Sequence, residues 1–181
     1  MGYADRYIHS LAASNLMDDE NHCQAEPLMA AGFAASHLGG PGSLLMRVKY
    51  MDATARKDFE GNPENLRQLR KLWIAEVTKR GTARMWVAIN SERDEKTAHY
   101  LYVLVAHESL SYWLDGKCKE CGGTGLHEHR ACKPCDGSGE APIKHKGAFI
   151  ADRIKDMVSE LREMETGFAG VANRWMQNVR L

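Results

Sequence analysis

Apolar residues recur every three or four positions along most of the chain, which is the spacing of one buried face of an α-helix. The clearest stripe consists of Leu66, Leu69, Trp73 and Val77. It predicts a helix over residues 63–79. Asn62 can accept hydrogen bonds from the free N–H groups of the first turn, Pro63 suits the first helical position, and Gly81 is placed to end the helix.

Weaker patterns predict further helices on both sides of this segment. The expected ranges are 3–17, 25–38, 43–59, 82–90 and 94–114. Ser43 is the candidate N-cap of the third of these helices. Tyr100–Ala106 is an aliphatic and aromatic run that could form a strand by itself, but no segment of similar quality offers a partner strand. The sequence therefore predicts an all-α fold.

The helical period resumes at Gly147 and continues towards the end of the chain. Its apolar positions are Ile150, Ile154, Met157, Leu161, Met164, Phe168, Val171, Trp175 and Val179. These steps of three and four residues predict one long C-terminal helix that packs on the helical body. Gly167 and Gly170 are expected either to kink this helix or to allow another helix to approach it closely.

Composition divides the chain into four parts. Residues 116–147 hold seven of the sixteen glycines and two of the five prolines, so this stretch interrupts the helical pattern. The breakers Gly39, Gly40 and Pro41 mark an earlier boundary. The expected parts are an N-terminal helical segment (1–41), a basic helical region (42–115), a cysteine module (116–146) and the C-terminal helix (147–181).

The cysteine module contains two copies of the pattern C-x-x-C-x-G-x-G, separated by ten residues between the cysteine pairs. The cysteines are Cys118, Cys121, Cys132 and Cys135. Two residues between cysteines let both sulfurs approach one ion, and the glycines let the backbone bend around it. Two such turns on a hairpin predict a tetrahedral shell around one structural zinc ion, because a closed shell leaves no position for substrate. The alternatives are a redox dithiol and an iron–sulfur site.

Other residues near the module are interpreted more simply. His127, His129 and His145 could replace a cysteine ligand, but four matched cysteines make them surplus, so we expect exposed loop histidines. Cys23 has no ligand pattern around it and is expected to be a buried or unreactive thiol. Three lysines beside the ligands can offset the negative charge of the shell or reach phosphate: Lys117, Lys119 and Lys133.

The module resembles two known families. Paired C-x-x-C-x-G-x-G turns resemble the zinc region of DnaJ-type chaperones, which carry four copies and a His-Pro-Asp motif, whereas this chain has two copies and no His-Pro-Asp. The whole arrangement is more similar to bacteriophage late-gene antitermination proteins of the Q type. Their helical segments surround a zinc module that follows a helix ending much like Trp113–Cys118.

The resemblance to the Q-type proteins implies a function. It implies binding to double-stranded DNA near a phage late promoter, and loading onto paused bacterial RNA polymerase with its sigma factor. The loaded polymerase then bypasses pauses and terminators in the cytoplasm of the bacterial host. No catalytic residue is carried over, because this activity remodels the polymerase stoichiometrically. Whether the protein associates with itself on DNA is left open.

The distribution of charge bears on DNA binding. The net charge is zero, which excludes a globally basic nucleic-acid binder, but residues 42–93 carry eleven basic against six acidic side chains. The candidate DNA contacts are Arg67, Arg70, Lys71, Lys79, Arg80 and Arg84. Arg67 and Lys71 point away from the apolar face and are expected to meet phosphates. The helix at 63–79, a turn at Gly81 and a second helix from Thr82 would form a helix-turn-helix with Arg84 reading bases, although such hairpins also occur as plain packing units.

Several other classes are disfavoured. No apolar run is long enough to span a membrane and no export signal precedes the first helix, so an intracellular protein is expected. No nucleophile, phosphate loop or open metal constellation indicates an enzyme. The remaining alternative is a chaperone-like or adaptor module, in which zinc braces a hairpin that binds a protein partner without binding DNA.

Overall fold

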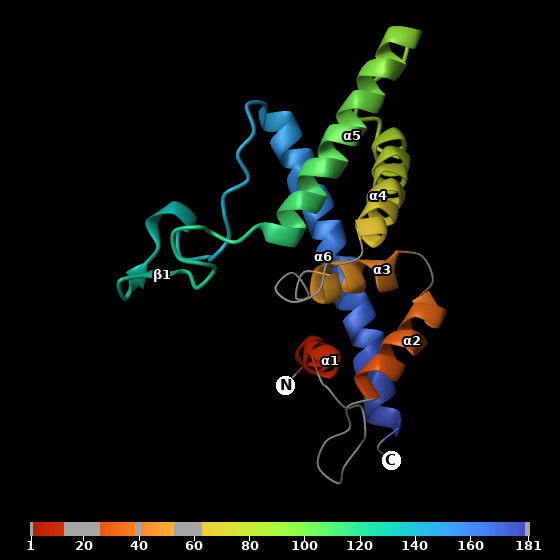
Figure 1. The fold of residues 1–181 in the computed structure, drawn as a ribbon. Coiled ribbons are helices and arrows are strands. Elements are labelled where there is room, and N and C mark those ends of the chain that lie inside the picture. The colour runs from red at the N-terminus through yellow and green to blue at the C-terminus, as the bar shows by residue number, and fades with distance from the viewer. Residues whose placement is uncertain (1, 13–25, 39–40, 53–62, 180–181) are drawn as a thin grey trace. The chain divides into compact units, whose positions relative to one another are not determined.

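The computed structural model describes residues 2–12, 26–38, 41–52 and 63–179, and over these it is predominantly helical (Figure 1). The α-helices are α1 (Tyr3–Ala12), α2 (Glu26–Leu38), α3 (Gly42–Met46), α4 (Pro63–Ala83), α5 (Glu92–Asp115) and α6 (Ala148–Val179). A π-helical segment, η1 (Arg47–Asp52), continues α3. The all-α class, the cysteine module in an inserted loop region and the long C-terminal helix are confirmed.

The chain forms two compact units. One comprises Met1–Leu72 with Arg162–Leu181, and the other comprises Trp73–Leu161. Helices α4 and α6 therefore contribute residues to both units. The cysteine module belongs to the second unit.

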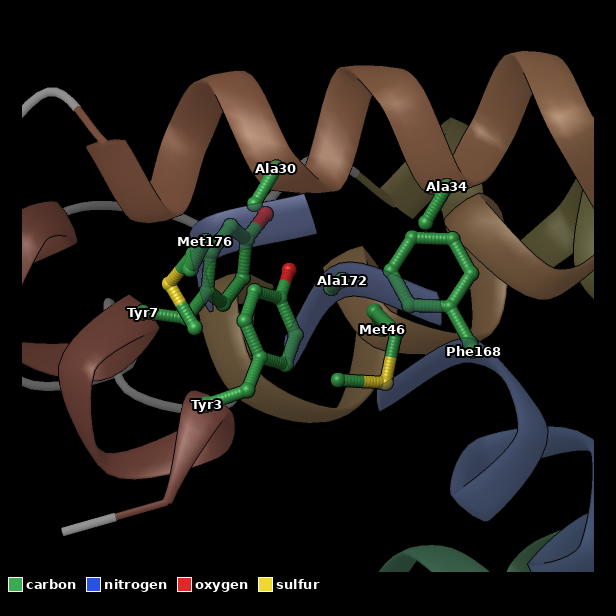
Figure 2. Packing of buried hydrophobic residues seen from close by; sticks show 8 residues of the cluster. All are labelled: Tyr3, Tyr7, Ala30, Ala34, Met46, Phe168, Ala172 and Met176. Carbon is green, nitrogen blue, oxygen red and sulfur yellow. The ribbon is translucent and has the colours of Figure 1, made fainter. Parts of the chain in front are cut away.

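The core of the first unit combines large aromatic rings with small alanines. Its buried members are Tyr3, Tyr7, Ala30, Ala34, Met46, Phe168, Ala172 and Met176. Ala30 and Ala34 lie one turn apart on α2, and Figure 2 shows both methyl groups facing the tyrosine and phenylalanine rings. Small residues at these two positions leave room for the rings of α1 and α6.

An acidic side chain of α6 binds two residues of η1 at the edge of this core. Lys49 Nζ lies 2.7 Å from a Glu165 carboxylate oxygen, and the Tyr50 hydroxyl donates to the other oxygen. Burial raises the pKa of Tyr50, and the neighbouring Glu165 raises it further. The three side chains tie η1 to α6.

The core of the second unit is built by α4, α5 and α6. Its buried side chains include Trp73, Val77, Trp86, Tyr102, Val105, Leu110, Trp113, Ile154, Met157, Val158 and Leu161. One polar contact lies inside this apolar set, where Trp73 Nε1 donates to Ser109 Oγ over 3.0 Å. The serine hydroxyl satisfies an indole donor that would otherwise be buried without a partner.

Helix α4 continues past the glycine that was expected to end it. Gly81 is buried and lies inside α4. Tyr102 packs so closely over it that a Cβ at this position would lie 2.5 Å from Cε1 of Tyr102. The glycine thus serves close packing against α5 rather than chain reversal. The backbone N–H of Trp86 donates to the Gly81 carbonyl over 3.0 Å, which closes a turn after the helix.

The predicted helix at 82–90 is wrong, and with it the predicted helix-turn-helix. Met85 adopts a left-handed backbone with φ 48°, and no helix follows until α5. Ser91 caps α5 by accepting from the Asp94 N–H over 3.3 Å. The helix predicted at 94–114 is confirmed, so the strand alternative for Tyr100–Ala106 is excluded.

Three further expectations have clear outcomes. Ser43 is not an N-cap, because α3 begins at Gly42 after Pro41 and has no side-chain cap. Helix α6 runs without interruption through Gly167 and Gly170, and nothing lies within 4 Å of a Cβ built at either, so the expected close packing there is wrong. Gly39, Gly40, Asn62 and Cys23 lie outside the described residues.

Candidate metal centre

The cysteine module begins where α5 ends (Figure 1). A side chain in the last turn of α5 binds the backbone at the end of the module. The Tyr112 hydroxyl donates to the Ala141 carbonyl over 2.6 Å, and the Ala141 N–H donates to the Gly116 carbonyl over 2.8 Å. An isolated antiparallel bridge also pairs Lys117 with Glu140. These contacts close the module into a loop with a fixed base on α5.

A short hairpin brings the second cysteine pair back onto the first. Strand β1 (Leu126–His127) pairs antiparallel with β2 (Arg130–Ala131), with His127 opposite Arg130. The two residues of the turn, Glu128 and His129, both have left-handed backbones with φ 49° and 63°. Two consecutive residues in this region are typical of the tight hairpin turn that matches the twist of the strands.

The two cysteine copies are joined by a reciprocal pair of backbone hydrogen bonds. The N–H of Cys118 donates to the carbonyl of Gly139 over 2.9 Å, and the N–H of Cys132 donates to the carbonyl of Gly125 over 2.8 Å. In each case the first cysteine of one copy binds the last glycine of the other. The sequence repeat is therefore matched by an internal symmetry of the structure.

The glycines of the repeat are needed where the two turns cross. A Cβ on Gly125 would lie 2.2 Å from the carbonyl oxygen of Gly137, and a Cβ on Gly139 would lie 2.4 Å from that of Gly123. Gly125 and Gly139 also have positive φ angles, of 74° and 77°. Only glycine fits both the backbone conformation and the close approach.

The four sulfurs converge as the repeat predicts. Sγ of Cys118 lies 3.9 Å from Sγ of Cys132, and Sγ of Cys121 lies 3.8 Å from Sγ of Cys135. All four sulfur atoms lie within 4.8 Å of one another, and all four residues are buried. Within the described part of the chain this is the one group of three or more metal-binding side chains close enough to share an ion, and it includes none of the nearby histidines. The four cysteines can hold a metal ion.

Two thiols of this cluster have pKa values that are shifted in opposite directions. Burial alone would raise the pKa of Cys121, but hydrogen bonds from the backbone of Gly123 and Gly125 and from neighbouring cysteines lower it to about 6. Burial and the neighbouring thiols raise the pKa of Cys132 to about 12. Four sulfurs this close cannot all carry charge by themselves, so a cation is needed to stabilise four thiolates.

The candidate DNA contacts on α4 and in the connection after it fall into two groups. The first group, Arg67, Arg70, Lys71 and Lys79, is exposed. Within this group Arg67 forms an exposed ion pair with Glu64, three residues earlier on the same helix. Exposed ion pairs of this kind are weak, so a stronger anion can take the place of the Glu64 carboxylate at Arg67.

The second group is bound to acidic residues in the second unit. Arg80 Nε lies 2.7 Å from Glu76, and the Arg80 guanidinium also pairs with Glu160 of α6. Arg84 lies 2.7 Å from the other oxygen of Glu160. Burial raises the pKa of Glu160, but the hydrogen bond from Arg84 and the charge of Arg80 outweigh it and lower the pKa overall. The role of Glu160 is absent from the sequence argument, because it depends on which turns of α4 and α6 meet.

A groove beside the hairpin is a second feature that the sequence did not predict. It has a volume of about 380 Å³ and is lined by Glu120, His127, Glu128, Arg130, Ala131, Cys132, Lys133 and Pro134. From the sequence, His127 and Lys133 are expected only as residues beside the metal. The hairpin places Glu128 and Arg130 at the same groove, and the first cysteine turn adds Glu120.

Comparison with protein-family models, with curated proteins and with solved structures finds no match to this chain. Among the described helices, none combines the length and the apolar composition needed to cross a membrane.

Proposed function

We propose that this protein is a bacteriophage transcription antitermination factor that binds double-stranded DNA near a late promoter. It loads onto paused bacterial RNA polymerase with its sigma factor, in the cytoplasm of the host, and allows read-through of pauses and terminators. The observation that carries the proposal is the convergence of two C-x-x-C-x-G-x-G turns between helices α5 and α6. This is the arrangement that resembles the Q-type proteins. The protein acts by stoichiometric binding rather than by bond chemistry.

The proposed ion of the module is one structural zinc. With Zn–S bonds of about 2.3 Å, the sulfurs of a tetrahedral shell are about 3.8 Å apart. The distances of 3.9 Å and 3.8 Å between the paired sulfurs support this geometry. Four thiolates would close the shell, so the zinc fixes the fold of the module and offers no open position to a substrate. The lysines beside the ligands reduce the negative charge of the shell: Lys117, Lys119 and Lys133.

The proposed DNA contacts lie first on the exposed group of α4, namely Arg67, Arg70, Lys71 and Lys79. Arg80 and Arg84 already bind Glu160, so a phosphate would have to compete with a carboxylate for them. Substituting either of these two would also break its ion pair with Glu160 of α6. The exposed group is therefore the better target for a test of DNA binding.

Transcription in vitro tests the proposal directly. Bacterial RNA polymerase transcribes a template that bears the phage late promoter and a downstream terminator, with and without the zinc-loaded protein. We expect more full-length transcript when the protein is present. Unchanged read-through with fully zinc-loaded protein would contradict the proposal.

A pair of double variants tests the DNA contacts separately. Arg67→Gln with Lys71→Gln should reduce duplex binding and lower the slope of log affinity against log salt by about 1.8, because each lost phosphate contact contributes about 0.9. Arg93→Gln with Lys96→Gln removes two exposed cations from α5 and serves as the control. Equal losses in both double variants would show that only overall charge matters.

The alternative function is a chaperone-like or adaptor module that binds a protein partner without binding DNA. It predicts that the protein fails to bind duplex DNA at moderate salt and that the double variants behave like the wild type. It is favoured by one observation, namely that Arg80 and Arg84 are already bound within the protein. A positive read-through assay combined with loss in the Arg67 and Lys71 variant excludes it.

A further inference from the structure

The groove beside the hairpin, hereafter the hairpin groove, is the feature that the proposed function does not use. Its lining residues come from both copies of the cysteine repeat and from the strands between them. The copies are fixed relative to each other by the metal ligands and by the reciprocal Cys118 and Cys132 hydrogen bonds. The groove is therefore a preformed surface wherever the module is folded.

Planar side chains lie on one side of the groove. His127 and Arg130 are opposite each other in the register of the hairpin, so their side chains share a face. Both also line the groove. The apolar side chain of Leu126 is 58% exposed but does not line it. The groove thus offers an imidazole and a guanidinium rather than an aliphatic anchor.

Charged groups of both signs surround these planar groups. Glu120 and Glu128 contribute carboxylates, and Arg130 and Lys133 contribute cations. Over the part of the chain that the structure describes, no salt bridge joins any of these four side chains to another residue. They remain available to a ligand that has both an anionic group and hydrogen-bond donors.

We propose that the hairpin groove binds a segment of single-stranded nucleic acid. Imidazole and guanidinium groups stack on unpaired bases, and Arg130 and Lys133 match the charge of the phosphates. The carboxylates of Glu120 and Glu128 can accept hydrogen bonds from base amino groups, which are accessible when the bases are unpaired. The charged and planar side chains of the groove thus each have a partner on a single strand.

Two other classes of ligand fit the groove less well. A volume of about 380 Å³ is at the lower end of small-ligand sites and suits one or two nucleotides rather than a duplex. A protein partner needs an apolar anchor at its centre, whereas Ala131 and Pro134 are the only apolar residues of the lining besides a metal ligand. Strands of two residues are also too short to receive an added peptide strand.

The inference goes beyond the proposed function and does not depend on it. Duplex binding is assigned to α4, whereas the hairpin groove lies in the cysteine module. If read-through failed, single-strand binding could still be measured, and if single-strand binding failed, the read-through assay would still decide the proposed function. The two failures are therefore distinguishable.

Fluorescence anisotropy with labelled oligonucleotides tests the proposal on the full-length, zinc-loaded protein. The probes are short mixed-sequence strands of RNA and of DNA, the matching duplex, and an abasic strand of the same length. His127→Ala should weaken single-strand binding on the order of tenfold, through loss of stacking. Arg130→Gln with Lys133→Gln should lower the salt slope by about 1.4, because each phosphate contact to a single strand contributes about 0.7.

Lys144→Gln is the matched control, because Lys144 is an exposed cation of the same module that neither lines the groove nor lies beside the metal ligands. It should leave affinity and salt slope unchanged, and every variant should retain one zinc ion per chain. Preference for RNA supports a contact to the 2′-hydroxyl, and equal binding of RNA and DNA supports stacking and phosphate contacts alone. The proposal is overturned if single strands are not bound, if the abasic strand binds equally well, or if Lys144→Gln loses as much as the groove variants.

Discussion

Replacing Gly81 by alanine adds a single methyl group at the point where α4 meets α5. The new Cβ would lie 2.5 Å from Cε1 and 2.8 Å from Cδ1 of Tyr102, and 2.9 Å from Cε3 of Trp86. Carbon atoms in contact are normally about 3.5–4.0 Å apart. Tyr102 is 3% exposed and Trp86 is 9% exposed, so neither ring can move aside into solvent.

Two opposing effects set the size of the change. Overpacking a core costs about 1–3 kcal/mol, and three contacts below 3.0 Å with buried rings place this substitution near the upper limit. Alanine in place of glycine inside a helix stabilises by about 1 kcal/mol. The net expected loss is about 2 kcal/mol, which lowers Tm by roughly 4–8 °C for a chain of this size.

Gly167→Ala provides the comparison, because a Cβ at that position of α6 meets nothing within 4 Å. It should stabilise the protein by about 0.4–1 kcal/mol, as alanine does wherever the helix accepts it without a clash. Thermal and urea unfolding followed by circular dichroism measure both variants. A Gly81→Ala protein as stable as the wild type would refute the close-packing explanation.

Three further substitutions test other contacts. Ser109→Ala leaves the indole N–H of Trp73 buried without an acceptor and should cost about 1–3 kcal/mol in urea unfolding. Gly125→Ala should abolish stoichiometric zinc binding, because its Cβ would collide with a backbone carbonyl. Gly122→Ala has the same left-handed backbone strain, with φ 61°, but nothing within 4 Å of its Cβ, so it should lose about 1–2 kcal/mol and still retain zinc. Glu160→Gln should destabilise the protein at neutral pH and progressively less as the pH falls below about 4.3, the ordinary pKa of glutamate.

The sign of the last prediction follows from the lowered pKa of Glu160. A carboxyl group with a lower pKa in the folded state contributes stability above its unfolded pKa and loses it as the pH falls through the folded pKa. The glutamine variant lacks that contribution at every pH, so the difference from the wild type should shrink on acidification. A constant difference across pH would contradict the assignment.

For Ser109→Ala, the control is Ser159→Ala on the exposed face of α6, which should have little effect.

Patterns of nearby residues predict the helices and the metal site, because these features depend mainly on residues that are close in sequence. The stripe from Leu66 to Val77 predicted α4, and the stripe from Ile150 onward predicted α6 as one helix. The spacing of the four cysteines predicted a shared metal site, because the repeat encodes both the turns and their glycines. These features depend on residues that are close in sequence or related by the repeat.

Errors arose where contacts between distant residues decide the conformation. Glycine is a residue type typical of helix ends, but Gly81 lies inside α4 because Tyr102 packs over it. Arg84 was assigned to a second helix, yet it lies in the connection after α4 and binds Glu160 of α6. The hairpin groove likewise depends on the register that places Arg130 opposite His127. No pattern within a single segment contains this information.

The metal content of the purified, reduced protein tests the central claim most directly. Zinc is quantified by mass spectrometry for the wild type and for a Cys121→Ser variant, and cobalt substitution reports the coordination through its visible absorption. We predict one zinc per wild-type chain, a tetrahedral thiolate spectrum with cobalt, and loss of both in the variant. A wild-type protein without stoichiometric zinc, or a variant that retains it unchanged, would contradict the account.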